Sequence, residues 1–447
     1  MQPLYTLSNS DLSSLFKQHI SEKVSRFQKI LESNNIDQLL IGSGKSKLQF
    51  QDDMAYPFKA NPYFREWLPL DKRTNCFVHI QRSNDKPKLY LSCEEDIWHS
   101  TPQELPASLA EPFDIIEYFS LDTLKKQLKA TNKTLTLINE TNDIDSPESA
   151  WNPQQVLYAI DFQRRNKTNY EQACVREANY LAIPAHRAAE YAFKSGASEL
   201  EIASAYLSAC NRSESEMPYS IIAGINENAA VLHHHQLNRK PVKPRSFLID
   251  AGVEFNHYAS DITRTYAFDE NSDFEAMIQQ LNQAQLALVA QGGVGKSPMV
   301  LQVLAQQKIA QILIDFNILK VSIEQALDKK IINTFFPHGL GHHLGCNVHD
   351  KGSRLANSRG DKFPASEKYP RLRASASMVA GQIYTVEPGI YFIPALLNKL
   401  NASDNAASIN WQEIKQWLPF GGIRIEDNII LHADGRLENI TRQAFRK

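Results

Sequence analysis

The chain has 447 residues, which is long for one hydrophobic core, so we expect two domains. It carries 48 basic and 50 acidic side chains, and this balance gives no electrostatic case for nucleic acid or an anionic membrane as a partner. The five cysteines are widely spaced and form no CxxC pair, so neither a zinc knuckle nor a disulfide framework is indicated.

Signals for export and for membrane insertion are not expected in this sequence. Residues 1–20 hold no basic region followed by an apolar one. No stretch approaches the run of about eighteen apolar residues that a membrane helix needs. We therefore expect a soluble protein of the reducing cytoplasm.

Helices and strands alternate in the first third of the chain. A helical pattern covers residues 9–34, the apolar strand IDQLLI follows at 36–41, and further strands are predicted at 76–80 and 87–92. This alternation is typical of an α/β domain, which we place at residues 1–160.

Two glycine-rich stretches, GSGKS at 42–46 and GGVGKS at 292–297, end like a phosphate-binding loop. Neither completes the motif, because Leu39 and Ala290 stand where its leading glycine belongs. Nucleotide binding is therefore not expected.

The remaining residues, 161–447, open with helical patterns. Thr168 and Glu171 have the spacing of a capping box, which predicts a long amphipathic helix that ends at Gly196, and Ser198 begins a second helix in the same way. Further helices are predicted at 273–290 and 299–316, and strands and turns are expected to dominate from residue 331 to the end.

The stretch LIDAGVEFNHYASDITRT predicts a hairpin with acids on both strands. A two-residue turn at Asn256 and His257 pairs Asp250 with Thr263. Asp250 and Asp261 then share one face as diagonal neighbours, about 7–8 Å apart at the backbone. Two carboxylates aimed at one point repel unless a cation lies between them, so the hairpin suggests a metal site. The alternative is a pair of solvated surface acids.

Three later segments carry further acids and histidines. FFPHGLGHHLGCNVHD places four histidines among glycines that let the backbone pack closely, QIYTVEPGIYF has Glu387 where strand pairing ends, and PFGGIRIEDNIIL puts Arg424 and Glu426 on one face. Each has an ordinary alternative: a core histidine, a turn acid, or half of a surface ion pair. The four histidines are His338, His342, His343 and His349.

The hairpin and these segments together offer four carboxylates and an imidazole. Such an oxygen-rich set suits manganese or cobalt better than it suits a structural zinc site with sulfur ligands. Four negative charges also balance two divalent ions, and two ions about 3.5–4 Å apart can activate one water for attack on a carbonyl or phosphoryl group. The sequence therefore predicts a two-metal hydrolytic site.

The motifs in this order resemble the pita-bread metallopeptidases, specifically the bacterial Xaa-Pro dipeptidases, or prolidases. DDMAYPFKANPYFREWLP and DIWH in the amino-terminal part resemble the subgroup also called organophosphorus acid anhydrolases. The resemblance implies an α/β amino-terminal domain and an α+β pita-bread (creatinase/aminopeptidase-like) catalytic domain. In the hairpin turn, His257 stands where relatives commonly carry glycine.

A five-residue metal site follows from this resemblance. It implies that Asp261 and Glu426 bridge two divalent ions, that Asp250 completes one ion, and that His342 with Glu387 completes the other. Manganese is the usual ion of the family.

The resemblance also implies a pocket around the metals. Within it, Arg373 corresponds to the arginine that binds the carboxylate of a C-terminal proline. The candidates for proton transfer are His233, His349 and Glu387, with no ranking among them. The full set of expected catalytic residues is His233, His338, His349, Glu387 and Arg424, and that of substrate-binding residues is Tyr219, Arg373, Arg424 and Trp98.

The function implied is hydrolysis of Xaa-Pro dipeptides by attack of a metal-bridging hydroxide. A guanidinium fixed near the metals would bind a dipeptide's free carboxylate, whereas a longer peptide presents no charge at that point. The alternatives are an aminopeptidase P acting on longer peptides and a catalytically silent binding module. Promiscuous hydrolysis of organophosphate triesters and a homodimer, in which Trp98 reaches the neighbouring pocket, are further expectations.

Overall fold

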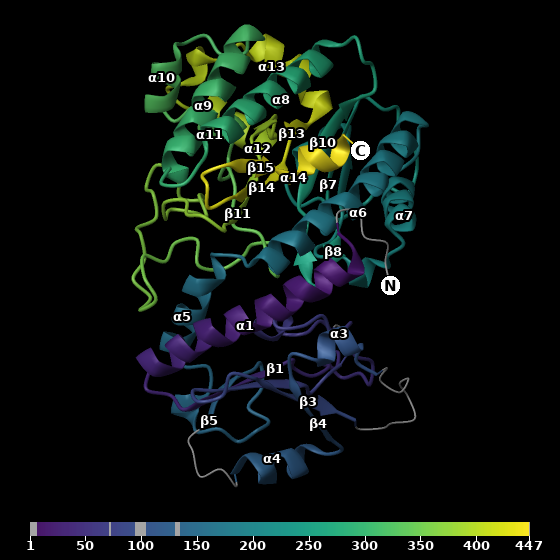
Figure 1. Ribbon diagram of the computed structural model, residues 1–447. Coiled ribbons are helices and arrows are strands. Elements are labelled where there is room, and N and C mark those ends of the chain that lie inside the picture. The colour runs from purple at the N-terminus through teal and green to yellow at the C-terminus, as the bar shows by residue number, and fades with distance from the viewer. Residues whose placement is uncertain (1–6, 71–72, 94–103, 130–134, 447) are drawn as a thin grey trace. The chain divides into compact units, whose positions relative to one another are not determined.

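The computed structural model describes residues 7–70, 73–93, 104–129 and 135–446, and it divides into two compact units (Figure 1). The expected boundary near residue 160 stays a prediction. The first unit comprises Met1–Cys174, Asn256–Tyr258 and Leu355–Lys362, and the second comprises Val175–Phe255, Ala259–Arg354 and Phe363–Lys447.

The first unit is an α/β domain, as expected, built on a mixed five-stranded sheet in the order β4-β3-β2-β1-β5. Strand β1 pairs antiparallel with β2 and parallel with β5. The strands are β1 (Gln38–Gly42), β2 (Phe77–Gln81), β3 (Lys88–Ser92), β4 (Asp114–Tyr118) and β5 (Leu135–Ile138).

Helices cover both faces of this sheet (Figure 1). The long helix α1 (Asn9–Ser33) begins at a capping box formed by Ser8 and Asp11, and it packs on β2 and on α5 (Gln154–Arg164). On the other face, α4 (Leu121–Lys129) buries its leucines against the sheet. Two short helices, α2 (Pro62–Arg65) and α3 (Ala107–Ala110), complete the unit.

The second unit contains small antiparallel sheets rather than one large one. One has the order β10-β7-β6, another the order β11-β14-β15, and β12 pairs with β13. The strands are β6 (Ile222–Ile225), β7 (Ser246–Ala251), β10 (Ile262–Ala267), β11 (Ile383–Val386), β12 (Gly389–Tyr391), β13 (Gly422–Arg424), β14 (Asp427–Leu431) and β15 (Leu437–Asn439).

Helices flank these strands (Figure 1). The helices α8 (Asp273–Gln291) and α9 (Pro298–Asp315) share a core with β11, β12 and β14, while α7 (Glu199–Cys210) packs on β6. The remaining helices are α6 (Asn169–Lys194), α10 (Ile323–Asp328), α11 (Ile332–Phe335), α12 (Pro394–Asn401), α13 (Trp411–Trp417) and α14 (Ile440–Phe445).

The acidic hairpin has the predicted register. Asp250 pairs with Thr263, and the turn residues Asn256 and His257 have φ of 46° and 74°. Both values are positive, as a two-residue turn of this type requires, although neither residue is glycine. A Cβ atom on Gly252 would lie 1.9 Å from the carbonyl oxygen of Ser260, so only glycine fits there. Within the hairpin, β8 (Glu254–Phe255) pairs with β9 (Tyr258–Ala259).

The predicted helices appear within one or two residues of their expected bounds. Strands, turns and loops dominate after residue 331, as expected, and the short helices α11 to α14 lie among them. Across the part of the chain that the structure describes, every helix is too short or too polar to span a lipid bilayer.

Candidate metal centre

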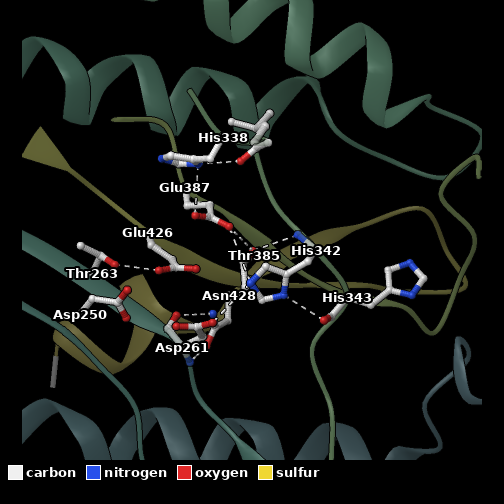
Figure 2. Close-up of polar contacts among 12 residues, drawn as sticks. Asp250, Asp261, Thr263, His338, His342, His343, Thr385, Glu387, Glu426 and Asn428 are labelled. Carbon is white, nitrogen blue, oxygen red and sulfur yellow. Dashed lines mark hydrogen bonds and ion pairs between the residues drawn. The ribbon is translucent and has the colours of Figure 1, made fainter. Parts of the chain in front are cut away.

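Five side chains from four segments converge on one place in the second unit (Figure 2). Ligand atoms of Asp261, His342 and Glu426 all lie within 4.8 Å of one another. The Nε2 atom of His342 is 3.6 Å from Oε1 of Glu387, and Asp250 lies beside Asp261. The structure thus brings together all five residues expected to bind metal, and their role as ligands stays a prediction.

The acids occupy the ends of strands. Asp250 is the fifth residue of β7, Asp261 directly precedes β10, Glu387 directly follows β11, and Glu426 lies between β13 and β14. At these positions the backbone is held by strand pairing while the side chain is free to turn inward. The hairpin and two further sheet ends therefore aim their carboxylates at a common point.

The histidine of the centre comes from a loop that packs tightly on β11. The backbone N–H of Thr385 donates to the carbonyl oxygen of His342 at 2.9 Å. A Cβ atom on Gly341 would lie 2.0 Å from the carbonyl oxygen of Thr385. Only glycine therefore lets the loop approach the strand this closely, as the spacing of glycines and histidines suggested.

Mutual repulsion and burial shape the electrostatics of the centre. Burial raises the pKa of Asp261 well above its usual value, and the charge of Asp250 raises it further. Burial and then the charge of Asp261 raise the pKa of Glu426, and burial and then the charge of Glu426 raise the pKa of Glu387. Such a group of buried carboxylates is stable in its charged form only with cations among the oxygens.

The hydroxyl of Tyr219 gives a second indication that this group of oxygens suits a cation. It lies 2.9 Å from Oδ1 of Asp250 and 2.6 Å from Oδ1 of Asp261. A hydroxyl carries one proton, so it can donate to only one of these two oxygens at a time. The oxygens outnumber the donors here, and an oxygen-rich group short of donors fits hard divalent ions.

Neighbouring polar groups fix the two acids that are expected to bridge the metals. The hydroxyl of Thr263 donates to Oε2 of Glu426 at 2.7 Å. The side-chain amide of Asn428 donates to the backbone carbonyl of Asp261 at 2.6 Å, and its oxygen accepts from the Asp261 N–H at 3.0 Å. These bonds join β10 to the start of β14, and they hold the carboxylate of Glu426 and the backbone of Asp261 in place.

The ring of His342 is oriented for a metal ligand. Its Nδ1 atom lies 3.0 Å from the backbone carbonyl oxygen of His343. A carbonyl only accepts, so Nδ1 carries the proton and Nε2 is left with its lone pair. That Nε2 atom faces Oδ2 of Asp261 at 3.4 Å and Oε1 of Glu387 at 3.6 Å.

Arg424 lies within the centre and is engaged by all three of its guanidinium nitrogens. Nη2 donates to Oδ2 of Asp250 at 2.5 Å, Nη1 to the Tyr391 hydroxyl at 2.9 Å, and Nε to the Thr263 hydroxyl at 3.0 Å. These bonds link Asp250 to two other side chains. The expected direct role of Arg424 toward substrate stays a prediction.

Tyr391 connects Arg424 to His338. The Tyr391 hydroxyl accepts from Arg424, so its own proton goes to Nε2 of His338, 2.8 Å away. The Nδ1 atom of His338 then donates to the carbonyl oxygen of Gly339 at 2.9 Å. Burial, followed by the charge of Arg424, lowers the pKa of His338 to about 3. This histidine is therefore neutral and fixed in one tautomer.

The other expected pocket residues surround His349. The rings of His349 and His342 are 4.4 Å apart between centroids. Burial, followed by the charges of His342, Arg373 and His233, lowers the pKa of His349 to about 3. His233 and Arg373 are both exposed. Trp98, the remaining expected residue, lies outside the described residues.

Sequence reasoning did not single out Tyr391, Thr263 or Asn428. All three lie inside motifs that were recognised, and Thr263 was placed opposite Asp250 in the hairpin. The alternation in RIEDN put Arg424 and Glu426 on one face but could not indicate which residues of other strands they meet. Only the pairing of distant strands brings these partners together.

Comparison with known proteins gives consistent results over almost the whole chain. Residues 173–433 match metallopeptidase family M24, and residues 14–162 match the Xaa-Pro dipeptidase N-terminal domain. Proteins named Xaa-Pro dipeptidase from Pseudoalteromonas translucida and Shewanella pealeana are 43% and 41% identical, in each case over 96% of this chain and 98% of the relative.

Solved structures of aminopeptidase P from Escherichia coli share the fold. The one with the inhibitor Pro-Leu has a TM-score of 0.72 and 21% identity, and the match covers 96% of this chain and 95% of that one. At this identity the likeness indicates the fold alone. The matched family, the full-length relatives and the arrangement of acids together establish that the chain belongs to metallopeptidase family M24, a family of metal-dependent hydrolases with the pita-bread fold.

Proposed function

We propose that this chain is a Xaa-Pro dipeptidase that works with two divalent metal ions, with Mn²⁺ as the proposed ion. The observation that carries the proposal is the convergence of four acids and the Nε2 atom of His342. It is supported by relatives named Xaa-Pro dipeptidase that are 41–43% identical over 96% of the chain.

The residues present fit two hard divalent ions. Asp261, whose backbone is held by Asn428, and Glu426, whose carboxylate accepts from Thr263, would bridge the ions. Asp250 would complete one ion, and His342 with Glu387 would complete the other. When bound, the ions supply a Lewis acid and an activated water for hydrolysis of an amide.

Arg373 would bind the substrate carboxylate. It is exposed, and it is close enough to His342 and His349 for its charge to lower the pKa of both rings. A guanidinium can hold a carboxylate by two parallel hydrogen bonds. With the proline carboxylate held there, the preceding amide of a dipeptide would lie toward the acidic centre.

Three side chains remain candidates for moving the proton of the scissile amide. His349 is neutral because its pKa is lowered to about 3, His233 is exposed to solvent, and burial raises the pKa of Glu387. His338 has both ring nitrogens in hydrogen bonds, so it orients the pocket rather than exchanging protons freely. Single substitutions followed by pH profiles of kcat would rank the three.

The decisive experiment compares alanyl-proline with alanyl-prolyl-alanine at equal concentrations of Mn²⁺. In the tripeptide the carboxylate is displaced by one residue, about 3.5 Å. We expect the dipeptide to have the higher kcat/KM, and Arg373→Ala to reduce that preference. A preference of the wild-type protein for the tripeptide would refute the role of Arg373.

The alternative function is that of an aminopeptidase P acting on longer peptides. Aminopeptidase P from Escherichia coli shares the fold at 20–21% identity, which by itself favours neither function. The greater identity to proteins named Xaa-Pro dipeptidase favours the dipeptidase. The metal content decides whether the chain is instead a silent binding module: fewer than one tightly bound divalent ion per chain, with no gain of activity on adding Mn²⁺, would favour that reading.

Organophosphate triester hydrolysis is proposed as a side activity. A centre that activates water for attack on a carbonyl can also act on tetrahedral phosphorus. Release of fluoride from a fluorophosphate ester in the presence of millimolar Mn²⁺ is the expected result. If the wild-type protein releases fluoride no faster than the Asp261→Asn variant, this side activity is excluded.

We also propose a homodimer. The first unit carries an exposed apolar turn in which the N–H of Gln49 donates to the carbonyl oxygen of Met54 at 2.9 Å. Leu48, Phe50, Met54 and Tyr56 are 57%, 90%, 61% and 52% exposed, a concentration of apolar surface that a second copy could cover. A monomeric mass in light scattering at micromolar concentration would exclude the dimer. The proposed cytoplasmic location is tested by fractionating cells.

A further inference from the structure

A fully buried acid outside the metal centre holds the segment that carries His233. Glu199 is the first residue of α7 and is 0% exposed. Its Oε1 atom accepts from the N–H of Ile225 at 2.8 Å and from Nδ2 of Asn228 at 2.9 Å. Its Oε2 atom accepts from Nε2 of His234 at 2.9 Å and from the N–H of Asn238 at 2.7 Å.

These four donors lie on both sides of His233. Ile225 and Asn228 lie at the end of β6 and in the 3₁₀ helix Asn226–Ala230, and the other two lie in residues 231–238, which we call the histidine loop. The N–H of Leu200 also donates to the carbonyl oxygen of Asn238 at 3.2 Å. One carboxylate therefore fixes both ends of the segment.

The bond to His234 also sets the direction of its neighbours. His234 is buried, whereas His233 and His235 are exposed, and their rings are stacked with centroids 6.4 Å apart. Because the ring between them is held inward by Glu199, these two rings are directed to the opposite side. There the charge of His233 reaches His349.

Only a carboxylate satisfies these four donors. Its two oxygens offer about four lone-pair sites, while a glutamine of the same shape has one accepting oxygen and an NH₂ group that would face two donors. Four hydrogen bonds, each assisted by the negative charge, offset the cost of burying that charge. A change of Glu199 to Gln should therefore release one end of the segment and leave the helix in place.

We propose that Glu199 is a positioning residue for the active centre, which holds the histidine loop through His234 and thereby fixes the place of His233. This inference rests on the proposed function, because the consequence for hydrolysis depends on the pocket role of His233. The anchoring itself is independent of that role.

Two variants test the anchoring, and one provides a matched control. Glu199→Gln keeps the shape of the acid, and His234→Phe keeps a ring while removing the donor. Glu201→Gln makes the same chemical change in the same helical turn, where the carboxylate accepts from the N–H and the hydroxyl of Ser198. Thermal unfolding and metal analysis of all three variants would check that each one folds and binds Mn²⁺.

Amide hydrogen exchange of a peptide covering residues 226–238 is the direct readout. We expect exchange to accelerate by about tenfold or more in Glu199→Gln and His234→Phe, and to stay at the wild-type rate in Glu201→Gln. Exchange at the wild-type rate in both loop variants would overturn the anchoring role of Glu199.

Hydrolysis of alanyl-proline at saturating Mn²⁺ tests the consequence. We expect kcat/KM to fall between about 10-fold and 100-fold in Glu199→Gln, since small misplacements of a pocket group cost factors of this size. In a protein that already carries His233→Ala, adding Glu199→Gln should lower kcat/KM by less than about a further twofold, because the effect of Glu199 acts through His233. If the fold-losses of the two single variants multiply in full in the double variant, Glu199 acts independently of His233, and the positioning role is overturned.

The two proposals fail in different ways. A His233→Ala variant that hydrolyses alanyl-proline at the wild-type rate would remove His233 from the proposed mechanism. Amide exchange at the wild-type rate in both Glu199→Gln and His234→Phe would refute the anchoring role of Glu199, whatever the rate of hydrolysis.

Discussion

Replacing Tyr391 by phenylalanine should disrupt the centre without changing any expected metal ligand. The variant keeps the aromatic ring, which packs on His338 with centroids 5.4 Å apart. It removes the hydroxyl that accepts from Arg424 at 2.9 Å and donates to His338 at 2.8 Å. Two buried groups then lose a partner.

The cost can be worked out from these two bonds. Losing a hydrogen bond to the charged guanidinium costs about 1.5–3 kcal/mol, and leaving a buried neutral acceptor unpaired costs about 1–3 kcal/mol. Arg424 keeps its bonds to Asp250 and Thr263, so we expect the lower part of the summed range, about 2.5–4 kcal/mol, in the free energy of unfolding. If about half of this free energy is also lost from the stabilisation of the transition state for hydrolysis, kcat/KM falls about tenfold.

Urea denaturation and steady-state hydrolysis of alanyl-proline at saturating Mn²⁺ measure the two effects. Tyr63→Phe is the control, because its hydroxyl donates to Asp161 at 3.0 Å in the first unit. We expect this control to lose some stability and to keep its kcat/KM. A Tyr391→Phe protein with kcat/KM within twofold of wild type and an unchanged urea midpoint would refute the reasoning.

Three further predictions concern the metals, the hairpin and pH. Asp261→Asn should lower the bound Mn²⁺, measured by mass spectrometry after gel filtration, and reduce kcat by at least about a hundredfold. Gly252→Ala should destabilise the metal-free protein to urea by at least about 2 kcal/mol, because its Cβ would lie 1.9 Å from the oxygen of Ser260. Burial, followed by the charge of Lys88, lowers the pKa of His79 to about 4 from 6.5. Between these two pH values the unfolded chain binds a proton that the folded chain does not. The free energy of unfolding should therefore decrease by up to about 3 kcal/mol as the pH is lowered from 6.5 to 4. In His79→Leu, urea midpoints at pH 7 and pH 4.5 should differ less than in wild type.

The features that sequence predicted best depend on local rules. The hairpin register follows from a two-residue turn and a period of two, and the structure confirms that Asp250 pairs with Thr263. The helix starts follow from capping boxes, as at Ser198, where both bonds to Glu201 are present. The family resemblance is confirmed by the match to metallopeptidase family M24.

The contacts that sequence could not predict join distant segments. The bond of Thr263 to Glu426 spans 163 residues, and that of Arg424 to Asp250 spans 174. Nothing in the local pattern around Glu199 indicates that its carboxylate meets four donors from residues 225–238. Such contacts depend on how separate sheets and helices pack, which periodicity and capping do not determine.

The expected ligands are spread over Asp250 to Glu426, and no short stretch of the chain holds them all. A copy that is cleaved or left unfinished before residue 424 lacks both the carboxylate of Glu426 and the guanidinium of Arg424, which bonds Asp250. Incomplete chains would therefore be inert toward the peptides around them. If these residues hold the metals as proposed, only a folded chain that extends past Glu426 would have the complete centre.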